Sequence, residues 1–248
     1  MIDLHSHVLP GIDDGARDLD DALVMCRAAA EDGISILAGT PHVRSDYPTT
    51  ADQMMEALAE LRDAAGGLIR LVSGGEIAFD ELERPVEELR RFGLAGNPGV
   101  LLVETPYVGW PLDFGHRLQR LRDAAIVPVL AHPERNPDVQ LQPGLLMPLV
   151  ESGALVQLTA ASVDGRLGKA TRDCARYLID HELAHLIASD AHNPAIREIG
   201  LRDAAQAVGD DALAQWLTLD VPSAIVDGRP IPVRPPRAHS RLQRLLRR

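Results

Sequence analysis

The chain has 248 residues, of which 46% are hydrophobic and only 3% are aromatic, and its formal net charge is −11 at pH 7. This length fits one large domain with a sizeable core, whereas the acidic charge and the scarcity of aromatic rings argue against a nucleic-acid-binding surface. Because Cys26 and Cys174 give no disulfide framework and no apolar run is long enough to span a bilayer, we expect a cytoplasmic protein without a transmembrane segment.

Short apolar runs alternate with segments of helical periodicity along the chain. The expected strands are residues 2–5, 35–39, 69–74, 100–103, 127–131, 154–158 and 186–189. The expected helices are residues 19–31, 51–65, 85–92, 112–125, 144–152 and 171–181. This alternation is typical of βα units around a parallel sheet, and seven such units in one domain favour a closed α/β barrel over an open sheet.

Prolines mark the expected end of the folded part, at Pro222 and in the cluster of residues 230–236. We therefore divide the chain into a barrel domain, residues 1–232, and an Arg/Pro-rich tail, residues 233–248. The last fifteen residues hold six arginines and no acid, and Leu242, Leu245 and Leu246 would share one face of a helix. Two interpretations stay open for this tail: a solvated end, or an arm that docks on an anionic partner or membrane surface.

Polar side chains follow the C-terminal ends of six of the seven expected strands. They are His5 and His7, His42, Glu76, Glu104, His132, and Asp190 with His192. Ligands and catalytic groups gather at this rim in parallel barrels. A random distribution of histidines would not place them there so regularly, so the pattern predicts a functional site at the rim.

Imidazoles and carboxylates in this set predict a metal centre. His5 and His7 lie two residues apart on a strand and project to one face. Alone, such a pair is equally typical of surface or core histidines, and Asp14 in the loop of residues 11–15 is equally typical of an Asx turn. With Asp14 the set reaches five histidines and four carboxylates without a cysteine, which favours Mn²⁺, with Fe²⁺ and Zn²⁺ as alternatives. Nine donors exceed the needs of one ion, so we expect two or three.

Two arginines stand close behind proposed ligands. Arg135 follows His132 by three residues, and Arg44 follows His42 by two. A guanidinium at such a position can bind phosphate oxygens bidentately, although most arginines are simply solvated. Adjacent cations activate water and hold the oxygens of an in-line phosphoryl displacement, so the whole set predicts a phosphoester hydrolase. Neither cysteine lies in a phosphate-binding loop, which argues against a cysteine-based phosphatase.

Six ordered motifs carry a family resemblance: residues 1–7, 11–15, 40–42, 75–77, 131–135 and 189–193. Together they resemble the polymerase and histidinol phosphatase (PHP) family. The resemblance is greatest to its bacterial branch of manganese-dependent protein tyrosine phosphatases from capsule and exopolysaccharide systems. It covers residues 1 to about 230 and implies a distorted (β/α)₇ barrel with a trinuclear centre. Asp14 and Glu104, where some family members have histidine, match the tyrosine phosphatase branch.

The resemblance also implies a role for each ligand. His5, His7, Glu76 and Asp190 would surround one metal. Glu76 would bridge to a second metal, which Glu104 and His132 also hold. Asp14, His42 and His192 would hold a third.

The implied reaction is attack of a metal-bridging hydroxide on phosphotyrosine. Arg135 would neutralise the phosphoryl oxygens, with Arg44 as a second substrate-binding candidate. His192 or a metal-bound water would protonate the leaving phenolate. The expected substrate is a phosphotyrosine protein, with a bacterial tyrosine kinase as one candidate, and a homo-oligomer is a further expectation.

Other functions stay open at this stage. A small-molecule phosphatase of the histidinol-phosphate type would use the same site, and a noncatalytic metal-binding scaffold would need only the ligands. An amidohydrolase is disfavoured because many of these enzymes bridge their metals with a lysine at the fourth strand. Here Glu104 takes that position, and the single lysine, Lys169, starts a later helix.

Overall fold

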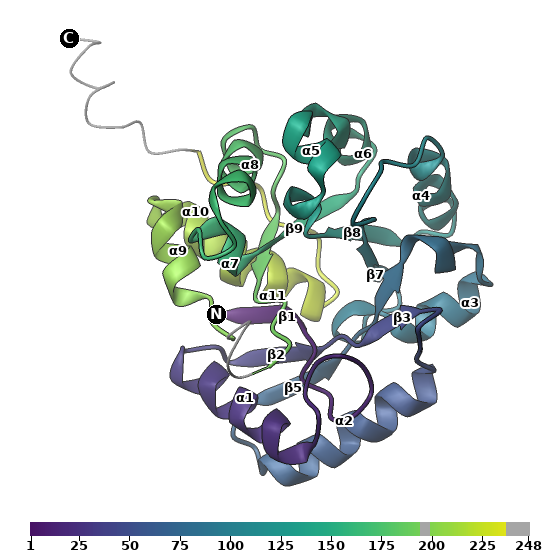
Figure 1. Cartoon of the computed structure of the whole chain (residues 1–248), viewed down its shortest axis with the longest axis vertical. Helices are drawn as coiled ribbons and strands as arrows, with labels where there is room; N and C mark the ends of the chain where they lie inside the picture. The colour runs from purple at the N-terminus through teal and green to yellow at the C-terminus, as the bar shows by residue number, and fades with distance from the viewer. Residues whose placement is uncertain (194–198, 237–248) are drawn as a thin grey trace.

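The computed structural model describes residues 1–193 and 199–236, and its strands form two sheets whose edges meet. In the smaller sheet, β2 (Ile36–Gly39) pairs in parallel with β1 (Ile2–Ser6) and β5 (Arg70–Ser73). The larger sheet has the order β10 (Leu186–Ala188), β9 (Leu155–Thr159), β8 (Val127–Ala131), β7 (Val100–Glu104), β6 (Glu76–Ala78), β3 (His42–Arg44) and β4 (Tyr47–Pro48). A bridge between Ser6 and Ala191 joins β1 to the segment after β10, which closes the ring on that side. Figure 1 shows the strands in the middle of the molecule with helices around them.

Two of the expected strands are each followed, after a break of two residues, by a second, short strand. Residues 40–41 separate β2 from β3, and Gly74 and Gly75 separate β5 from β6. Strand β2 pairs with β5, and β3 pairs with β6. The two breaks therefore lie side by side in neighbouring strands. Gly75 donates its N–H to Phe92 instead of to the ladder, and Pro41 has no N–H to donate. All seven expected strands are present, and the predicted distorted seven-stranded barrel is confirmed, with β3, β4 and β6 as short strands that the sequence did not predict.

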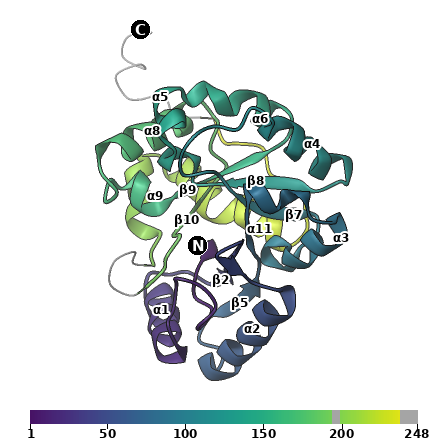
Figure 2. The same ribbon diagram turned by 45° about the vertical axis from the view of Figure 1, so that its right-hand side comes forward.

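Two long helices cover the smaller sheet. Helices α1 (Leu19–Glu31) and α2 (Ala51–Ala65) have the bounds expected from their periodicity and lie side by side (Figures 1 and 2). Asp18 caps the first turn of α1, and a capping box of Thr50 and Gln53 starts α2, which ends at left-handed Gly66. Helices α4 (Phe114–Asp123) and α8 (Lys169–Asp180) lie within two residues of their expected bounds.

The remaining helical segments are short. The expected helix of residues 85–92 is α3 (Val86–Leu89) with the 3₁₀ turn η2 (Arg90–Phe92), and that of residues 144–152 is η5 (Pro143–Leu146) with α6 (Met147–Glu151). Further segments are η1 (Phe79–Glu83), η3 (Leu94–Gly96), η4 (Pro133–Arg135), α5 (Pro137–Leu141), α7 (Ala160–Val163), α9 (Arg202–Val208) and α10 (Asp211–Gln215). In the described residues, no helix combines the length and the apolar character needed to span a membrane.

The last segments pack against the end of the barrel opposite the strand-end site. The π-helical segment η6 (Trp216–Asp220) and α11 (Val221–Val226) contact β1 and β10. Pro222 is buried at the start of α11, which directly continues η6, so the expectation that Pro222 ends the fold is wrong. Arg234, from the expected tail, donates to the carbonyls of Ile179 and Ala184. The expected leucine face at Leu242, Leu245 and Leu246 lies outside the described residues, as do the arginines after residue 236.

The core consists mainly of Leu, Ala, Val and Ile. Strands β1, β7 and β9 are buried along their whole length, as expected for strands covered on both faces. Cys26 and Cys174 are buried free thiols within α1 and α8.

Candidate metal centre

The nine expected ligands come together at the C-terminal ends of the strands. They form four overlapping groups, in each of which the ligand atoms lie within 4.8 Å of one another. The groups are His5–His7–Asp190, His5–Glu76–His132, His42–Glu76–Glu104 and His7–Asp14–His42–His192. Apart from Asp14, whose side chain is 38% exposed, every member is buried.

The first group and Glu76 have the spacing of a tetrahedral metal site. Nε2 of His5 lies 3.3 Å from Nε2 of His7, 3.4 Å from Oε2 of Glu76 and 3.5 Å from Oδ1 of Asp190. Nε2 of His7 lies 3.4 Å and 3.5 Å from the same two oxygens. Four ligands at about 2.1 Å from one ion are separated by roughly 3.4 Å, so these five distances match those between ligands of one cation.

Glu76 turns its two oxygens toward different groups. Oε2 is buried, accepts no hydrogen bond from a described residue, and lies 2.9 Å from Nδ1 of His42 as well as near His5 and His7. Oε1 lies 2.8 Å from Nε2 of His132. Burial alone would raise the pKa of Glu76, but the surrounding His5 and His42 hold this pKa well below its usual value. A carboxylate in this position suits a bridge between two cations.

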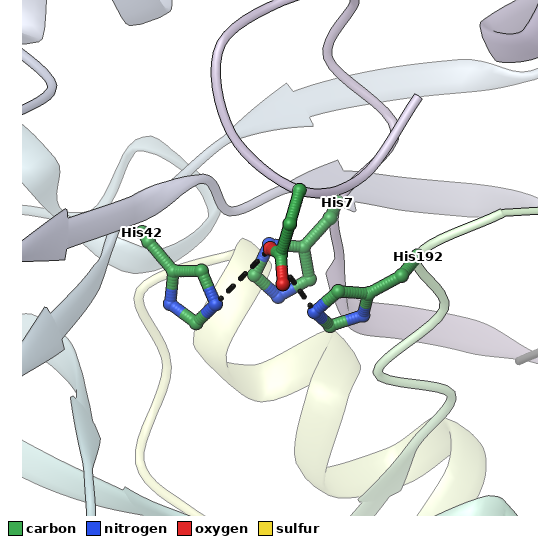
Figure 3. Close-up of side chains that lie close together, drawn as sticks. His7, His42 and His192 are labelled. Atoms are coloured by element: carbon green, nitrogen blue, oxygen red, sulfur yellow. Dashed lines mark ion pairs between the residues drawn. The ribbon is translucent and has the colours of Figure 1, made fainter. Parts of the chain in front are cut away.

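The histidines around Asp14 form a separate group on the exposed side. Oδ1 of Asp14 lies 3.4 Å from Nε2 of His42 and 3.5 Å from Nε2 of His192. Figure 3 shows the imidazoles of His7, His42 and His192 gathered around this carboxylate, which dashed lines join to His42 and His192. The other groups differ from the set that the resemblance implies in two pairings. Glu104 lies in a group with His42, and His132 lies in a group with His5.

Three histidines are oriented by acceptors at Nδ1. His5 donates to Oε1 of Gln157 at 2.9 Å, His7 to Oδ2 of Asp13 at 2.7 Å, and His192 to the carbonyl of Asp190 at 2.9 Å. Each bond places the proton on Nδ1 and leaves the lone pair of Nε2 facing the ligand groups. The sequence analysis missed Gln157 and Asp13. The Asx turn considered for Asp14 is made by Asp13, which accepts from the N–H of Gly15, and Asp14 faces His42 and His192.

Two more buried carboxylates lie within two residues of proposed ligands in the sequence. Asp3 accepts from the N–H groups of His5 and Ser189, and burial raises its pKa to about 6. Glu134 accepts from the N–H of Thr159, and burial raises its pKa to about 7. Both lie inside motifs that the sequence analysis quoted, but no pattern distinguished them there as supports.

Unusual backbone geometry positions two of the ligands. His132 and Asp190 have left-handed backbone conformations, with φ of 36° and 53°. Such conformations are costly for residues other than glycine and are concentrated at functional sites. The loop of residues 11–15 approaches β1 so closely that a Cβ on Gly15 would lie 2.0 Å from the carbonyl oxygen of His7. Only glycine fits at this position.

Two arginines and a tyrosine line the edge of the centre. Nη1 of Arg135 lies 2.5 Å from Oδ2 of Asp190, and Nη1 of Arg44 lies 3.3 Å from Oε1 of Glu104. Both guanidinium groups thus turn toward carboxylates of the centre. The Tyr107 ring lies 5.6 Å from the guanidinium carbon of Arg135 and stacks on His132 at 6.2 Å. Burial raises the pKa of Tyr107, which the sequence analysis missed, to about 12.

Comparisons with known proteins give consistent matches. Residues 1–225 match a family model described as capsular polysaccharide synthesis, CpsB/CapC. The tyrosine-protein phosphatase YwqE of Bacillus subtilis is 33% identical over 209 residues, 82% of each chain. The tyrosine-protein phosphatase CpsB of Streptococcus agalactiae serotype III is 26% identical over 223 residues, 85% of this chain and 90% of that protein. A solved structure, from work on YwqE and Streptococcus pneumoniae CpsB described as metal-dependent tyrosine phosphatases, superposes with a TM-score of 0.87. It is 30% identical and covers 97% of this chain and 100% of its own.

Proposed function

Because the chain belongs to the CpsB/CapC family of capsular polysaccharide synthesis, we propose that it is a metal-dependent protein tyrosine phosphatase. The family expected from the six motifs is thereby confirmed. The observation that carries the proposal is the set of overlapping ligand groups around Glu76, with Arg135 beside it. This arrangement suits two or three cations next to a group that binds phosphoryl oxygens.

The donors fit Mn²⁺ best, since imidazoles and carboxylates are mixed and no thiolate is present. When bound, such ions lower the pKa of a water molecule and offset negative charge on a phosphoryl group. His5, His7, Glu76 and Asp190 would hold one ion, and Asp14, His42 and His192 another. Glu104 and His132 would complete a third site that shares Glu76.

The arginines would bind and orient the phosphoryl group. Arg135 keeps one nitrogen on Asp190, so its planar group is held at a fixed angle beside the ligands. Arg44 is held by Glu104 on one side and Asp46 on the other. For His192, the geometry favours ligation over proton donation, because Nδ1 donates to a carbonyl and Nε2 belongs to a ligand group.

Metal reconstitution tests the proposal. Mn²⁺, Fe²⁺ or Zn²⁺ is added to protein whose metal content has been shown to be nil. Hydrolysis of a phosphotyrosine peptide, a phosphoserine peptide, histidinol phosphate and a nucleotide is then measured. We expect Mn²⁺ to restore phosphotyrosine hydrolysis and His5→Ala to abolish it. Full activity of verified metal-free protein in chelator would contradict the metal requirement, and a preference for histidinol phosphate would contradict the substrate. A tyrosine kinase as substrate, self-association and a cytoplasmic location stay predictions from the sequence.

A further inference from the structure

A groove of about 780 Å³ opens beside the metal centre. Its walls come from residues 44–46 at the end of β3, residues 78–80 at the end of β6, and residues 104–107 and 111 at and after the end of β7. Glu104 lines the groove and also belongs to the ligand group of His42 and Glu76. The groove is therefore continuous with the centre.

The walls of this groove include charged side chains and the rings of apolar side chains. Toward the ligands lie Glu104 and the Arg44 guanidinium that pairs with it. The other walls include Phe79, Tyr107 and Pro111, which present ring surfaces. Phe79 is held in place, because its ring packs edge-on against Phe114 at 4.9 Å. The exposed residues Asp46 and Asp80 also line the groove. A preformed groove that has ring surfaces and an arginine beside the metal centre suits a flat ring that carries an anionic group.

Two further cavities in the described part of the chain fit less well. One lies between the loop after β1 and helix α2, and its lining includes Asp46, Glu56 and Glu60 but no member of a ligand group. A phosphate monoester bound in this cavity would lie away from the ligand groups. The other lies between α5 and α8 and likewise contains no member of a ligand group.

We propose that this groove, named the aryl groove, binds the phenyl ring of phosphotyrosine while the phosphoryl group lies at the metal centre. The inference rests on the proposed function. His5 and Glu76 are fully buried, so a substrate must extend its phosphate inward on a long side chain. A tyrosyl ring provides this reach, whereas a phosphoseryl group would have to bring its peptide backbone into the groove. Tyr107 and Phe79 thus select aryl over alkyl phosphates.

Filling the groove tests its role without replacing a proposed ligand. Ala78 lines the groove at the end of β6, and Ala78→Phe would occupy it. Ala170→Phe is the matched control, because Ala170 lines the separate cavity on α8. A second variant, Tyr107→Leu, removes one ring if Ala78→Phe fails to fold.

Two measurements are made on the manganese-loaded proteins. Calorimetric titration compares phenylphosphonate with methylphosphonate, neither of which can be hydrolysed, and kinetics compare phosphotyrosine and phosphoserine peptides of one sequence. We expect Ala78→Phe to lose roughly tenfold or more in phenylphosphonate affinity and in kcat/KM for phosphotyrosine. Methylphosphonate binding and manganese content should change less than about twofold, and Ala170→Phe should match the wild type.

The outcomes separate the groove from the proposed function. If the wild type hydrolyses phosphotyrosine but Ala78→Phe and Tyr107→Leu keep the preference for phenylphosphonate, the aryl groove is wrong and the phosphatase stands. The groove also fails if both phosphonates weaken equally in both variants, since the substitutions would then disturb the centre itself. If metal-loaded wild-type protein hydrolyses no phosphoester, the proposed function fails and the groove with it.

Discussion

Replacing Asp13 by asparagine exchanges one carboxylate oxygen for an amide nitrogen, beside His7, His42 and Gly15. Oδ2 of Asp13 accepts from Nδ1 of His7 at 2.7 Å and from the N–H of His42 at 2.9 Å, while Oδ1 accepts from the N–H of Gly15 at 3.0 Å. Its side chain is 1% exposed. An amide nitrogen cannot accept, so either Gly15 or the pair His7 and His42 must lose its acceptor.

The size of the effect follows from these contacts. A buried donor without a partner costs about 1–3 kcal/mol, and a hydrogen bond to a charged group contributes about 1.5–3 kcal/mol. Loss of a partner that orients a metal-binding histidine typically weakens metal affinity about 10–100-fold, which is roughly 1.4–2.7 kcal/mol. The free energy of the lost hydrogen bond therefore agrees with the free energy that corresponds to the loss of metal affinity. We therefore expect Asp13→Asn to weaken manganese binding at least tenfold.

The assay is a manganese titration in which electron paramagnetic resonance counts the free ion. Asp20→Asn, at an exposed position in the first turn of α1, is the control and should bind as the wild type does. A manganese affinity of Asp13→Asn within twofold of the wild type would refute the reasoning that Asp13 orients His7. Equal weakening in Asp20→Asn would point to a general charge effect instead.

Three further predictions concern Gly15, Arg135 and His185. Gly15→Ala should lower the unfolding free energy by about 1–3 kcal/mol in denaturant, because its Cβ would lie 2.4 Å from Cβ of His7. Gly144→Ala, whose Cβ would have its nearest contact at 4.0 Å, should leave the unfolding free energy unchanged. Arg135→Lys should lower kcat/KM for phosphotyrosine roughly tenfold or more at unchanged manganese content, since an ammonium group lacks the planar fork; equal loss of metal would contradict this. Burial and then Arg234 lower the pKa of His185 from 6.5 to about 4, so only the unfolded chain gains this proton between these values. Stability should therefore fall by up to roughly 3 kcal/mol as pH drops from 6.5 to 4, and His185→Asn should lose that share of the slope in denaturation at several pH values; an unchanged slope would contradict the assignment.

Residue type and position after a strand predicted that the nine expected ligands would gather at one place, because parallel strands all end at one rim. What the sequence could not decide was which of two adjacent carboxylates turns inward. Asp13 and Asp14 have the same chemistry, and only the fold of the loop sends one to Nδ1 of His7 and the other to His42. Gln157 lies within an apolar strand, where a single polar residue gives no signal until its neighbour His5 is known.

The missed elements have local causes. Strands β3 and β6 have three residues each, too few for a periodic pattern. Helix α11 was missed because Pro222 was interpreted as a breaker, although proline is well suited to the first turn of a helix. Tyr107 lies in an irregular loop after β7, and its position over His132 depends on contacts that are distant in sequence.

The ring of strands closes where the start of the chain meets its late portion. Asp3 accepts from Ser189, 186 residues away, and the backbones of His5 and His7 bond to residues 190 and 191. During synthesis, the first two histidines therefore leave the ribosome long before Asp190, the carboxylate that lies opposite them. Metal held by His5, His7 and Asp190 would connect these two segments of the chain. Closing so long a loop has an entropy cost, which metal binding would offset. Bound metal would consequently mark a chain that has been translated to this point and folded.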